Sequence, residues 1–230
     1  MLEASADGGA LKTERKGVSL YDVVIEGRAA HAGLEPEKGV SAAVEVAHQV
    51  LAVAGLGDAG LGTTVTPTVV QAGTTTNTVA ARGRFAVDVR ARTRAEQERV
   101  DAALRGLVPH LDGARIVVEG GINRPPLEAV MSEELFATAS RLADRLGLPA
   151  PTSAGVGGAS DGNFTAGVGV PTLDGLGAVG GGAHADHEHV LVDELPGRTA
   201  LLGALVADRL HAGPSPSSVR DAHGRGGGGR

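Results

Sequence analysis

The 230-residue sequence contains no cysteine and no tryptophan, and it has only one tyrosine and three phenylalanines. Without cysteine the chain cannot form disulfide bonds, bind metal through thiolates or use a cysteine nucleophile. Any metal site must therefore be built from histidine nitrogens and carboxylate oxygens.

Basic charge and long apolar runs are also scarce. The formal net charge is -6, from 27 acidic and 21 basic residues, and this balance makes nucleic acid a poor partner. The N-terminus has neither the basic start nor the apolar run of a signal peptide, and no apolar stretch approaches the ~18 residues of a membrane helix. We therefore expect a soluble, cytoplasmic protein with no membrane or nucleic-acid partner.

Glycine, by contrast, is abundant, with 36 residues. It is concentrated in turns, around residues 157–182 and near the C-terminus. Residues 212–230 end in Gly-Arg-Gly-Gly-Gly-Gly-Arg, a composition that predicts a disordered tail.

Residues 18–121 alternate strand-like and helix-like patterns. Apolar residues recur at helical spacing from Val40 to Leu51 and again from Val100 to Val108. Pro67 cannot donate to a ladder, so its strand should be an edge or irregular one. The order βαββαβ predicts a ferredoxin-like α+β sandwich with both helices on one face. The expected strands cover residues 18–25, 63–70, 84–90 and 114–119.

Residues 122–211 suggest an α/β layer. We expect a helix with Ser132 as its N-cap, an apolar stripe up to Leu146, and Gly147 at its C-terminal end. The apolar run at 168–173 is interpreted as a buried strand, and residues 193–210 as a last amphipathic helix.

Chemistry is concentrated between Gly157 and His189. Glycines there let backbone amides approach a ligand closely. Five donors of the kind that zinc prefers also lie within six residues, which favours a metal-dependent hydrolase. These donors are His184, Asp186, His187, Glu188 and His189.

Six motifs occur in one order along the chain. They are Gly27-Arg-Ala-Ala-His-Ala-Gly33 with Pro36 and Gly39, Asn77-Thr-Val, Val87-Asp-Val-Arg90, Asn123-Arg-Pro-Pro126, Gly157-Gly-Ala-Ser-Asp161, and His184 with Glu188. Together they resemble the M20 family of di-zinc exopeptidases and amidohydrolases, which includes acetylornithine deacetylase, succinyl-diaminopimelate desuccinylase, glutamate carboxypeptidase and aminoacylase.

The resemblance implies a zinc-exopeptidase α/β catalytic domain interrupted by a ferredoxin-like dimerisation, or lid, domain. Residues 1–17 would end the first catalytic segment, 18–121 would form the lid, and 122–211 would be the C-terminal part of the catalytic domain. The family's first catalytic segment carries a His-x-Asp motif, a bridging Asp and a Glu-Glu pair, and it would lie upstream of Met1. We therefore expect the isolated chain to be inactive.

Two short sequences imitate the missing motifs. His184-Ala-Asp186 spells His-x-Asp, but it stands where the family has its last histidine ligand. Glu133-Glu134 spells the acidic pair, but it is expected in the first turn of a helix, where glutamates favour the positive end of the dipole. Three hypotheses remain: a truncated di-zinc hydrolase, a non-catalytic dimerisation or binding module that lost its zinc centre, and a chain whose missing half is supplied in trans.

Metal and catalytic roles follow from the resemblance. His184 resembles the terminal metal ligand and Glu3 the late carboxylate ligand, in a centre of two zinc ions with cobalt or manganese as alternatives. His31 resembles the lid histidine that reaches the partner subunit's active site and donates to the developing oxyanion, so it needs a homodimer. The implied reaction is hydrolysis of an amide next to a free carboxylate, in a small peptide or N-acyl amino acid.

Substrate contacts are implied in the same way. Asn77, Arg90 and Arg124 resemble the groups that hold the substrate, and a guanidinium suits bidentate contact with a carboxylate. Gly157, Gly158, Ala159 and Ser160 would offer backbone amides to the same carboxylate, and Asp161 would orient the loop. Asn163 replaces an arginine usual in desuccinylases, which favours the glutamate-carboxypeptidase-like and general amidase branches.

Overall fold

The computed structural model describes residues 1–212, which divide into two compact units. The central unit comprises Arg15–Glu128 together with Gly157–Ala159. The terminal unit comprises Met1–Glu14, Ala129–Val156 and the described residues from Ser160 onward. The expected disordered tail, after its first residue, lies outside the described residues. Among residues 1–212, no helix has both the length and the apolar character needed to cross a membrane.

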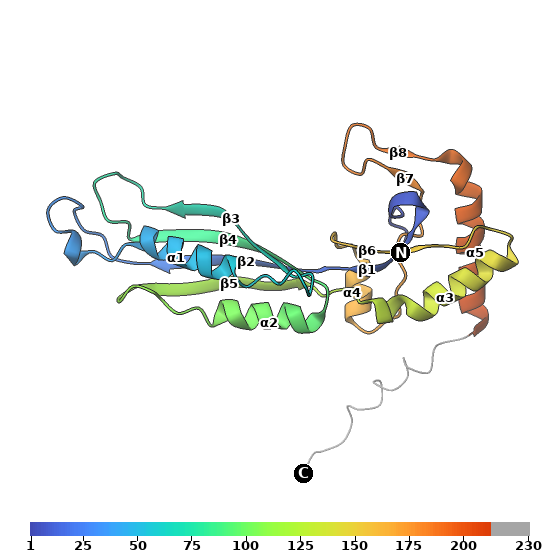
Figure 1. The fold of residues 1–230 in the computed structure, drawn as a ribbon, viewed down its shortest axis with the longest axis horizontal. Coiled ribbons are helices and arrows are strands. Elements are labelled where there is room, and N and C mark those ends of the chain that lie inside the picture. The colour runs from blue at the N-terminus through green and yellow to red at the C-terminus, as the bar shows by residue number, and fades with distance from the viewer. Residues whose placement is uncertain (213–230) are drawn as a thin grey trace, which may run out of the picture. The chain divides into compact units, whose positions relative to one another are not determined.

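The central unit is a four-stranded antiparallel sheet with two helices (Figure 1). In space the strands follow the order β3-β4-β2-β5, and every neighbouring pair is antiparallel. This is the ferredoxin-like arrangement predicted from the sequence. Along the chain the elements are β2 (Gly17–Glu26), a short 3-10 helix (Pro36–Lys38), α1 (Ala42–Ala54), β3 (Thr64–Ala72), β4 (Arg82–Ala91), α2 (Arg94–Arg105) and β5 (Arg115–Arg124).

Both helices pack against the same face of this sheet because alternate strand residues are apolar. Phe85 and Val89 of β4 are fully buried in one cluster with Val46 of α1 and Leu104 of α2. Burying one such side chain contributes about 1.5–3 kcal/mol relative to leaving it exposed. The other face of β4 is polar and carries Arg90.

Strand β3 lies at one edge of the sheet, as Pro67 predicted. The pairing of β3 with β4 shifts register between Pro67 and Val70. The edge position explains why a residue without a backbone N–H is tolerated there.

Each helix of the central unit has an N-cap that was not anticipated. The Ser41 hydroxyl accepts from Val44 N–H at 3.3 Å at the start of α1. The Thr93 hydroxyl accepts from Glu96 N–H at 3.2 Å at the start of α2. Each cap satisfies a backbone donor that has no partner within the helix.

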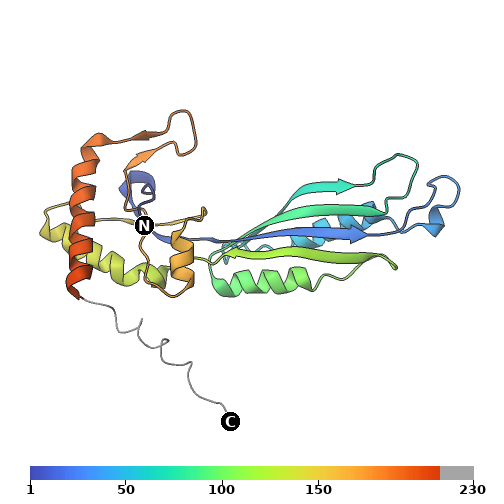
Figure 2. The ribbon, with the colours of Figure 1, turned by 180° about the vertical axis from the view of Figure 1, so that it is seen from behind.

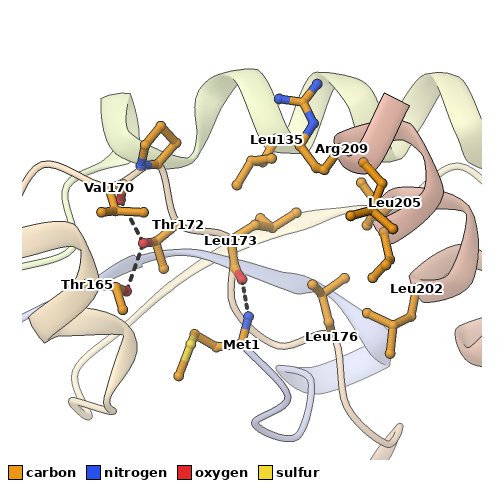
Figure 3. A pocket seen from close by; sticks show the side chains of 13 residues that line it. Met1, Leu135, Thr165, Val170, Thr172, Leu173, Leu176, Leu202, Leu205 and Arg209 are labelled. Atoms are coloured by element: carbon orange, nitrogen blue, oxygen red, sulfur yellow. Dashed lines mark hydrogen bonds between the residues drawn. The ribbon is translucent and has the colours of Figure 1, made fainter. Parts of the chain in front are cut away.

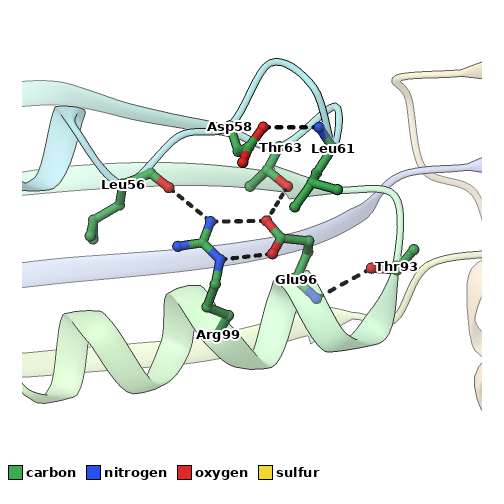
Figure 4. Close-up of polar contacts among 7 residues, drawn as sticks. All are labelled: Leu56, Asp58, Leu61, Thr63, Thr93, Glu96 and Arg99. Atoms are coloured by element: carbon green, nitrogen blue, oxygen red, sulfur yellow. Dashed lines mark hydrogen bonds and ion pairs between the residues drawn. The ribbon is translucent and has the colours of Figure 1, made fainter.

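An ionic cluster around the buried Glu96 ties the α1–β3 connection to α2 (Figure 4). The Glu96 carboxylate accepts from Arg99 at 2.7 and 2.9 Å and from the Thr63 hydroxyl at 2.7 Å. Arg99 also donates to the Leu56 carbonyl at 2.9 Å. The hydrogen bonds from Arg99 and then Thr63 hold the pKa of Glu96 below its ordinary value.

The terminal unit combines helices with two short sheets. One sheet pairs β1 with β6, and the other pairs β7 with β8. Its buried core includes Leu11, Leu142, Leu173 and Leu205. The elements are a 3-10 turn (Asp7–Gly9), β1 (Leu11–Arg15), α3 (Ala129–Arg145), β6 (Ser153–Val156), α4 (Gly162–Gly167), β7 (Gly180–Gly181), β8 (His189–Val190), a 3-10 turn (Val192–Glu194) and α5 (Leu195–Ala212).

The predicted start of α3 was wrong, although its end was right. The helix begins at Ala129, so Ser132 is a buried residue within its first turns. Its hydroxyl lies 2.8 Å from the carbonyl oxygens of Thr13 and Thr172, where it connects distant segments rather than capping the helix. Gly147 follows the helix with φ +65°, the left-handed conformation expected of a C-terminal glycine.

The buried strand predicted at 168–173 is also wrong. These residues form no strand, and Val168 and Val170 are 79% and 52% exposed, whereas Leu173 is buried. Gly169 has φ +83° and Pro171 lacks an N–H, and both features interrupt a ladder. The short strands β1 and β6 and the helix α4 were not predicted.

Candidate functional site

His31 and Asn77 come together at one end of the central sheet. His31 follows β2 and forms an isolated antiparallel bridge with Thr78, which follows β3. The Ala32 N–H donates to the Asn77 carbonyl at 2.9 Å, and the Val79 N–H donates to the Ala30 carbonyl at the same distance. These bonds hold the two loops side by side (Figure 2).

The His31 side chain is exposed in this loop pair. Its Nδ1 accepts the Gly33 N–H at 3.1 Å. A neutral imidazole that accepts at Nδ1 carries its proton on Nε2. His31 can therefore present an outward N–H donor, the group that stabilises a developing oxyanion.

Arg90 and Arg124 lie at the opposite end of the same sheet. Both pair with Val18 of the intervening strand, Arg90 from β4 and Arg124 from β5. Residues directly opposite each other across strands share one face of a sheet. The Asp88 carboxylate accepts from Arg90 at 2.7 and 2.8 Å, and this bidentate contact raises the pKa of Arg90.

The glycine loop of residues 157–159 is joined to that same end by Arg15. The backbones of Arg15 and Leu127 exchange hydrogen bonds at 2.9 and 3.0 Å, just before β2 begins. The largely buried Arg15 guanidinium donates to the Gly158 carbonyl at 2.8 Å. A Cβ placed on Gly157 or Gly158 would meet nothing within 4 Å, so the loop is open to a ligand.

The structure thus separates Asn77 from Arg90 and Arg124, with which the sequence analysis grouped it as a substrate contact. Along β2, Val18 marks the arginine end and Glu26 precedes the histidine end, a separation of about 26 Å at ~3.3 Å per residue. Within one central unit, neither His31 nor Asn77 can touch a small substrate held by Arg90 and Arg124. The candidate site is therefore two half-sites in each chain.

Ser160 does not present its amide as predicted. It is only 4% exposed, and its N–H donates to Asn163 Oδ1 at 2.9 Å. Its hydroxyl donates to the buried Asp174 at 2.6 Å and accepts from Gly162 N–H. Asp161 makes no side-chain cap bond, so in this structure Ser160, Asn163 and Asp174 hold the loop instead.

His184 lies in the loop that connects β7 and β8. Its φ is +66°, and it is the only non-glycine residue with positive φ in the described chain. Such a conformation costs of order 1–3 kcal/mol and is concentrated at functional positions. The side chain is exposed.

Glu3 lies on a segment that runs beside the approach to β7. The Gly177 N–H donates to the Glu3 carbonyl at 2.9 Å, and the Ser5 N–H donates to the Ala178 carbonyl at 3.0 Å. However, residues 1–212 contain no group of three His, Asp or Glu side chains placed to hold a metal ion. The donors present do not complete a metal centre, since catalytic zinc takes about three protein ligands.

The terminal unit also contains an apolar cavity of ≈ 470 Å³ (Figure 3). Aliphatic residues such as Leu135, Leu176 and Leu205 line it, together with Met1, whose terminal amine donates to the Leu173 carbonyl at 2.6 Å. The charged lining residue is Arg209, which is paired with Glu134 and Asp208. Among the described residues that line the cavity, none is a histidine, aspartate or glutamate.

Two residues of the arginine end and its glycine loop were missed by sequence reasoning. Arg15 stands in Lys-Thr-Glu-Arg-Lys, a pattern typical of a solvated strand, and Asp174 stands in Leu-Asp-Gly, which is typical of a turn. No local pattern distinguishes either residue, because the partners Gly158 and Ser160 are distant in the sequence.

Comparison with known proteins gives a consistent result. A family model described as a peptidase dimerisation domain matches residues 13–114, which lie almost entirely in the central unit. The chain is 30% identical over 218 residues to Carboxypeptidase G2 of Pseudomonas sp. (strain RS-16), covering 89% of this chain and 50% of that protein.

Solved structures show the same architecture. Aminopeptidase PepT from Bacillus cereus superimposes with a TM-score of 0.70 and 26% identity, covering 89% of this chain and 55% of that one. YXEP of Bacillus subtilis, described as a dinuclear metal binding peptidase of the M20 family, shares the fold with a TM-score of 0.59 and 19% identity, covering 90% of this chain and 53% of that one. The chain spans about half the length of these relatives.

Proposed function

Because the chain belongs to the M20 peptidase family, we propose that it forms part of a homodimeric, metal-dependent hydrolase that cleaves an amide next to a free carboxylate. The observation that carries this proposal is the separation of the two half-sites by about 26 Å of one sheet. A complete site then combines the arginine end of one chain with the His31 loop of its partner.

Each half-site has a distinct task in this proposal. Arg124, with its forked guanidinium donors, and the amides of Gly157–Ala159 would hold the substrate carboxylate. Arg90, whose Nε and Nη2 already contact Asp88, would add its Nη1–H donors. The partner subunit's loop would bring His31 Nε2–H to the carbonyl oxygen as negative charge develops there. Asn77 would contact the substrate from the same loop pair.

The metal, for which we favour zinc, would polarise the carbonyl and activate water. His184 and Glu3 are the donors that this chain would contribute. Because residues 1–212 do not complete the centre, its other ligands would come from outside these residues. We therefore propose that the chain alone does not hydrolyse substrate.

The first test is an activity assay. The coding sequence upstream of Met1 is read for an in-frame His-x-Asp and Glu-Glu, and the extended protein is assayed on N-acyl amino acids and short peptides with zinc, cobalt or manganese. We expect metal-dependent hydrolysis by the extended protein and none by the 230-residue chain. Absence of those motifs, or an inactive extended protein, would favour the non-catalytic dimerisation module.

The second test uses two variants of the active protein. His31→Ala should lower turnover by about 10²–10³-fold without changing metal content, as loss of one oxyanion donor does. His211→Ala, on the last turn of α5, is the control and should be fully active.

If His31 acts across subunits, mixing His31→Ala with inactive Arg90→Ala protein should restore about a quarter of wild-type activity, through one intact site in each mixed dimer. No recovery on mixing would place both groups in one subunit's site and contradict the proposal.

A further inference from the structure

A small cavity of ≈ 170 Å³ lies at the start of α5 in the terminal unit, and it contains none of the residues discussed above as candidate site residues. One wall is formed by Gly8 and Gly9, and another by residues 148–152 with Leu148 and Pro151. The third wall is the first turn of α5. This space is several times what one ordered water requires.

Arg198 brings a positive charge to this cavity. Its half-buried guanidinium donates to the Gly9 carbonyl. Burial lowers the pKa of Arg198, and the nearby charge of Glu194 acts in the opposite direction. Arg198 forms no ion pair within 4.0 Å with any described residue, so no carboxylate neutralises it by direct contact.

Glu194 brings a negative charge to the same cavity. It lies four residues before Arg198, at the end of the 3-10 turn that leads into α5. Side chains four residues apart on a helical turn are neighbours, with Cβ atoms about 5–6 Å apart. The two opposite charges therefore flank one hollow without closing on each other.

We propose that this cavity binds a small free α-amino acid, with its carboxylate on Arg198 and its ammonium group on Glu194. A simple carboxylate would meet repulsion from Glu194, and a simple amine would meet repulsion from Arg198. A zwitterion satisfies both groups with charge-assisted hydrogen bonds. An aliphatic side chain would contact Leu148, Pro151 and Leu201.

This inference does not depend on the hydrolase function, because it concerns binding alone. Free amino acids are, however, the products that an N-acyl amino acid or peptide hydrolase releases. If both proposals hold, the cavity is placed to sense product in the unit that carries His184.

The test is calorimetric titration of the 230-residue chain at low salt with L-alanine, L-valine, propionate and propylamine. We expect the amino acids to bind on the order of 10-fold more tightly than either single-charge probe, since each lost charge-assisted hydrogen bond weakens binding by about that factor. No saturable binding of either amino acid, or equal binding of propionate, would overturn the proposal.

Variants identify the site. Arg198→Gln should weaken L-alanine binding by on the order of 10-fold. Glu194→Gln should remove the preference for L-alanine over propionate. If Arg198→Gln lacks a normal thermal unfolding transition and so is not folded, the Glu194→Gln result alone tests the assignment of the site. Arg145→Gln, an exposed arginine at the end of α3, is the control and should bind like the wild type. Binding that is unchanged in Glu194→Gln would also overturn the assignment.

Discussion

The Ser160 hydroxyl donates to the Asp174 carboxylate at 2.6 Å, and the two residues are only 4% and 0% exposed. The other Asp174 oxygen accepts the Gly175 N–H, also at 2.6 Å. A carboxylate this deeply buried is stable only when its oxygens are hydrogen-bonded. Within the terminal unit, the hydrogen bond between Ser160 and Asp174 thus anchors the residue that directly follows the glycine loop of residues 157–159.

We therefore expect Asp174→Ala to lower the free energy of unfolding by about 1–3 kcal/mol, because the Ser160 and Gly175 donors would lose their buried acceptor. Asp161→Ala is the matched control, since Asp161 is exposed and makes no cap bond. Its effect should stay within about 0.5 kcal/mol. Urea denaturation followed by circular dichroism measures both, and equal losses would show that the buried network is not stabilising.

A second prediction concerns pH. The buried Glu45 carboxylate of α1 accepts from the backbone N–H groups of His110 and Leu111 and from the Gln49 side chain, at 2.7 to 3.1 Å. Burial alone would raise the pKa of Glu45, but these hydrogen bonds outweigh burial and lower it. Because the pKa of Glu45 is lower in the folded state, its carboxylate stabilises the folded protein at pH values above the unfolded pKa of about 4.3. This stabilisation is lost as the pH falls through the pKa of the folded state.

Glu45→Gln should therefore destabilise the protein by about 1–3 kcal/mol at pH 7, because the amide offers one acceptor where the carboxylate offers two. The difference between variant and wild type should shrink below about pH 4. Glu119→Gln, an exposed residue of β5, should show little difference at either pH. Unfolding free energies measured at pH 7 and pH 3.5 decide this, and a pH-independent difference would contradict the explanation.

A third prediction compares Gly113 and Gly120, two glycines with the same positive φ. Gly113 and Gly120 both have φ +84°, so alanine at either position is strained by about 1–2 kcal/mol. A Cβ at Gly113 would lie 3.4 Å from Val40 Cγ2, which is ordinary contact, whereas a Cβ at Gly120 would lie 2.2 Å from the Leu20 carbonyl oxygen.

Gly120→Ala should hence destabilise the protein by clearly more than Gly113→Ala, because β5 must move away from β2 to accommodate the methyl group. Thermal unfolding of the two variants side by side measures the difference. Similar melting temperatures would mean that the pairing of β2 and β5 is less rigid than the structure implies.

A fourth prediction concerns the proposed homodimer. At the β3 edge, Val69 and Val70 are each 51% exposed, and Leu51 of the adjacent α1 is 75% exposed. At the other edge, α2 carries ion pairs between Arg94 and Glu98 and between Arg105 and Asp101. An open, apolar edge strand is a template for pairing with a second copy.

We expect Leu51→Glu to weaken dimerisation on the order of 10-fold or more, which corresponds to about 1.4 kcal/mol, as measured by analytical ultracentrifugation. Ile122→Glu changes a 44% exposed residue on β5 and should leave the dimer intact. If only Ile122→Glu dissociates the dimer, the interface lies at the β5 edge instead.

The central unit was predictable because its patterns are local. The alternation of residues 84–90 indicated a strand with one buried face, and Pro67 indicated an edge, and both expectations are confirmed. The terminal unit was predicted less well because the roles of its residues depend on partners that are distant in the sequence. The sequence suggested Ser132 as an N-cap. In the structure Ser132 lies within α3, and its hydroxyl contacts the carbonyl oxygens of Thr13 and Thr172 instead.

For the candidate site, too, the residues could be named from the sequence, but their arrangement in space could not. The resemblance to the family, carried by short sequence motifs, singled out His31, Asn77, Arg90 and Arg124 as candidate site residues. That Asn77 lies beside His31, at the end of the sheet opposite Arg90 and Arg124, did not follow from the sequence, because strand pairing decides which of these residues can meet. Arg15, which joins the glycine loop to the arginine end, carried no signal in the sequence.

The sequence by itself determined the βαββαβ order, the family motifs and the restriction of any metal site to histidine and carboxylate ligands, since composition and periodicity are properties of neighbouring residues. The tertiary structure alone decided that Arg90 and Arg124 flank Val18, whereas the loop that carries His31 follows the other end of that strand, at Glu26, about 26 Å from Val18. Strand pairing joins residues far apart in the chain, and its register is set by hydrogen bonds and burial over the whole sheet.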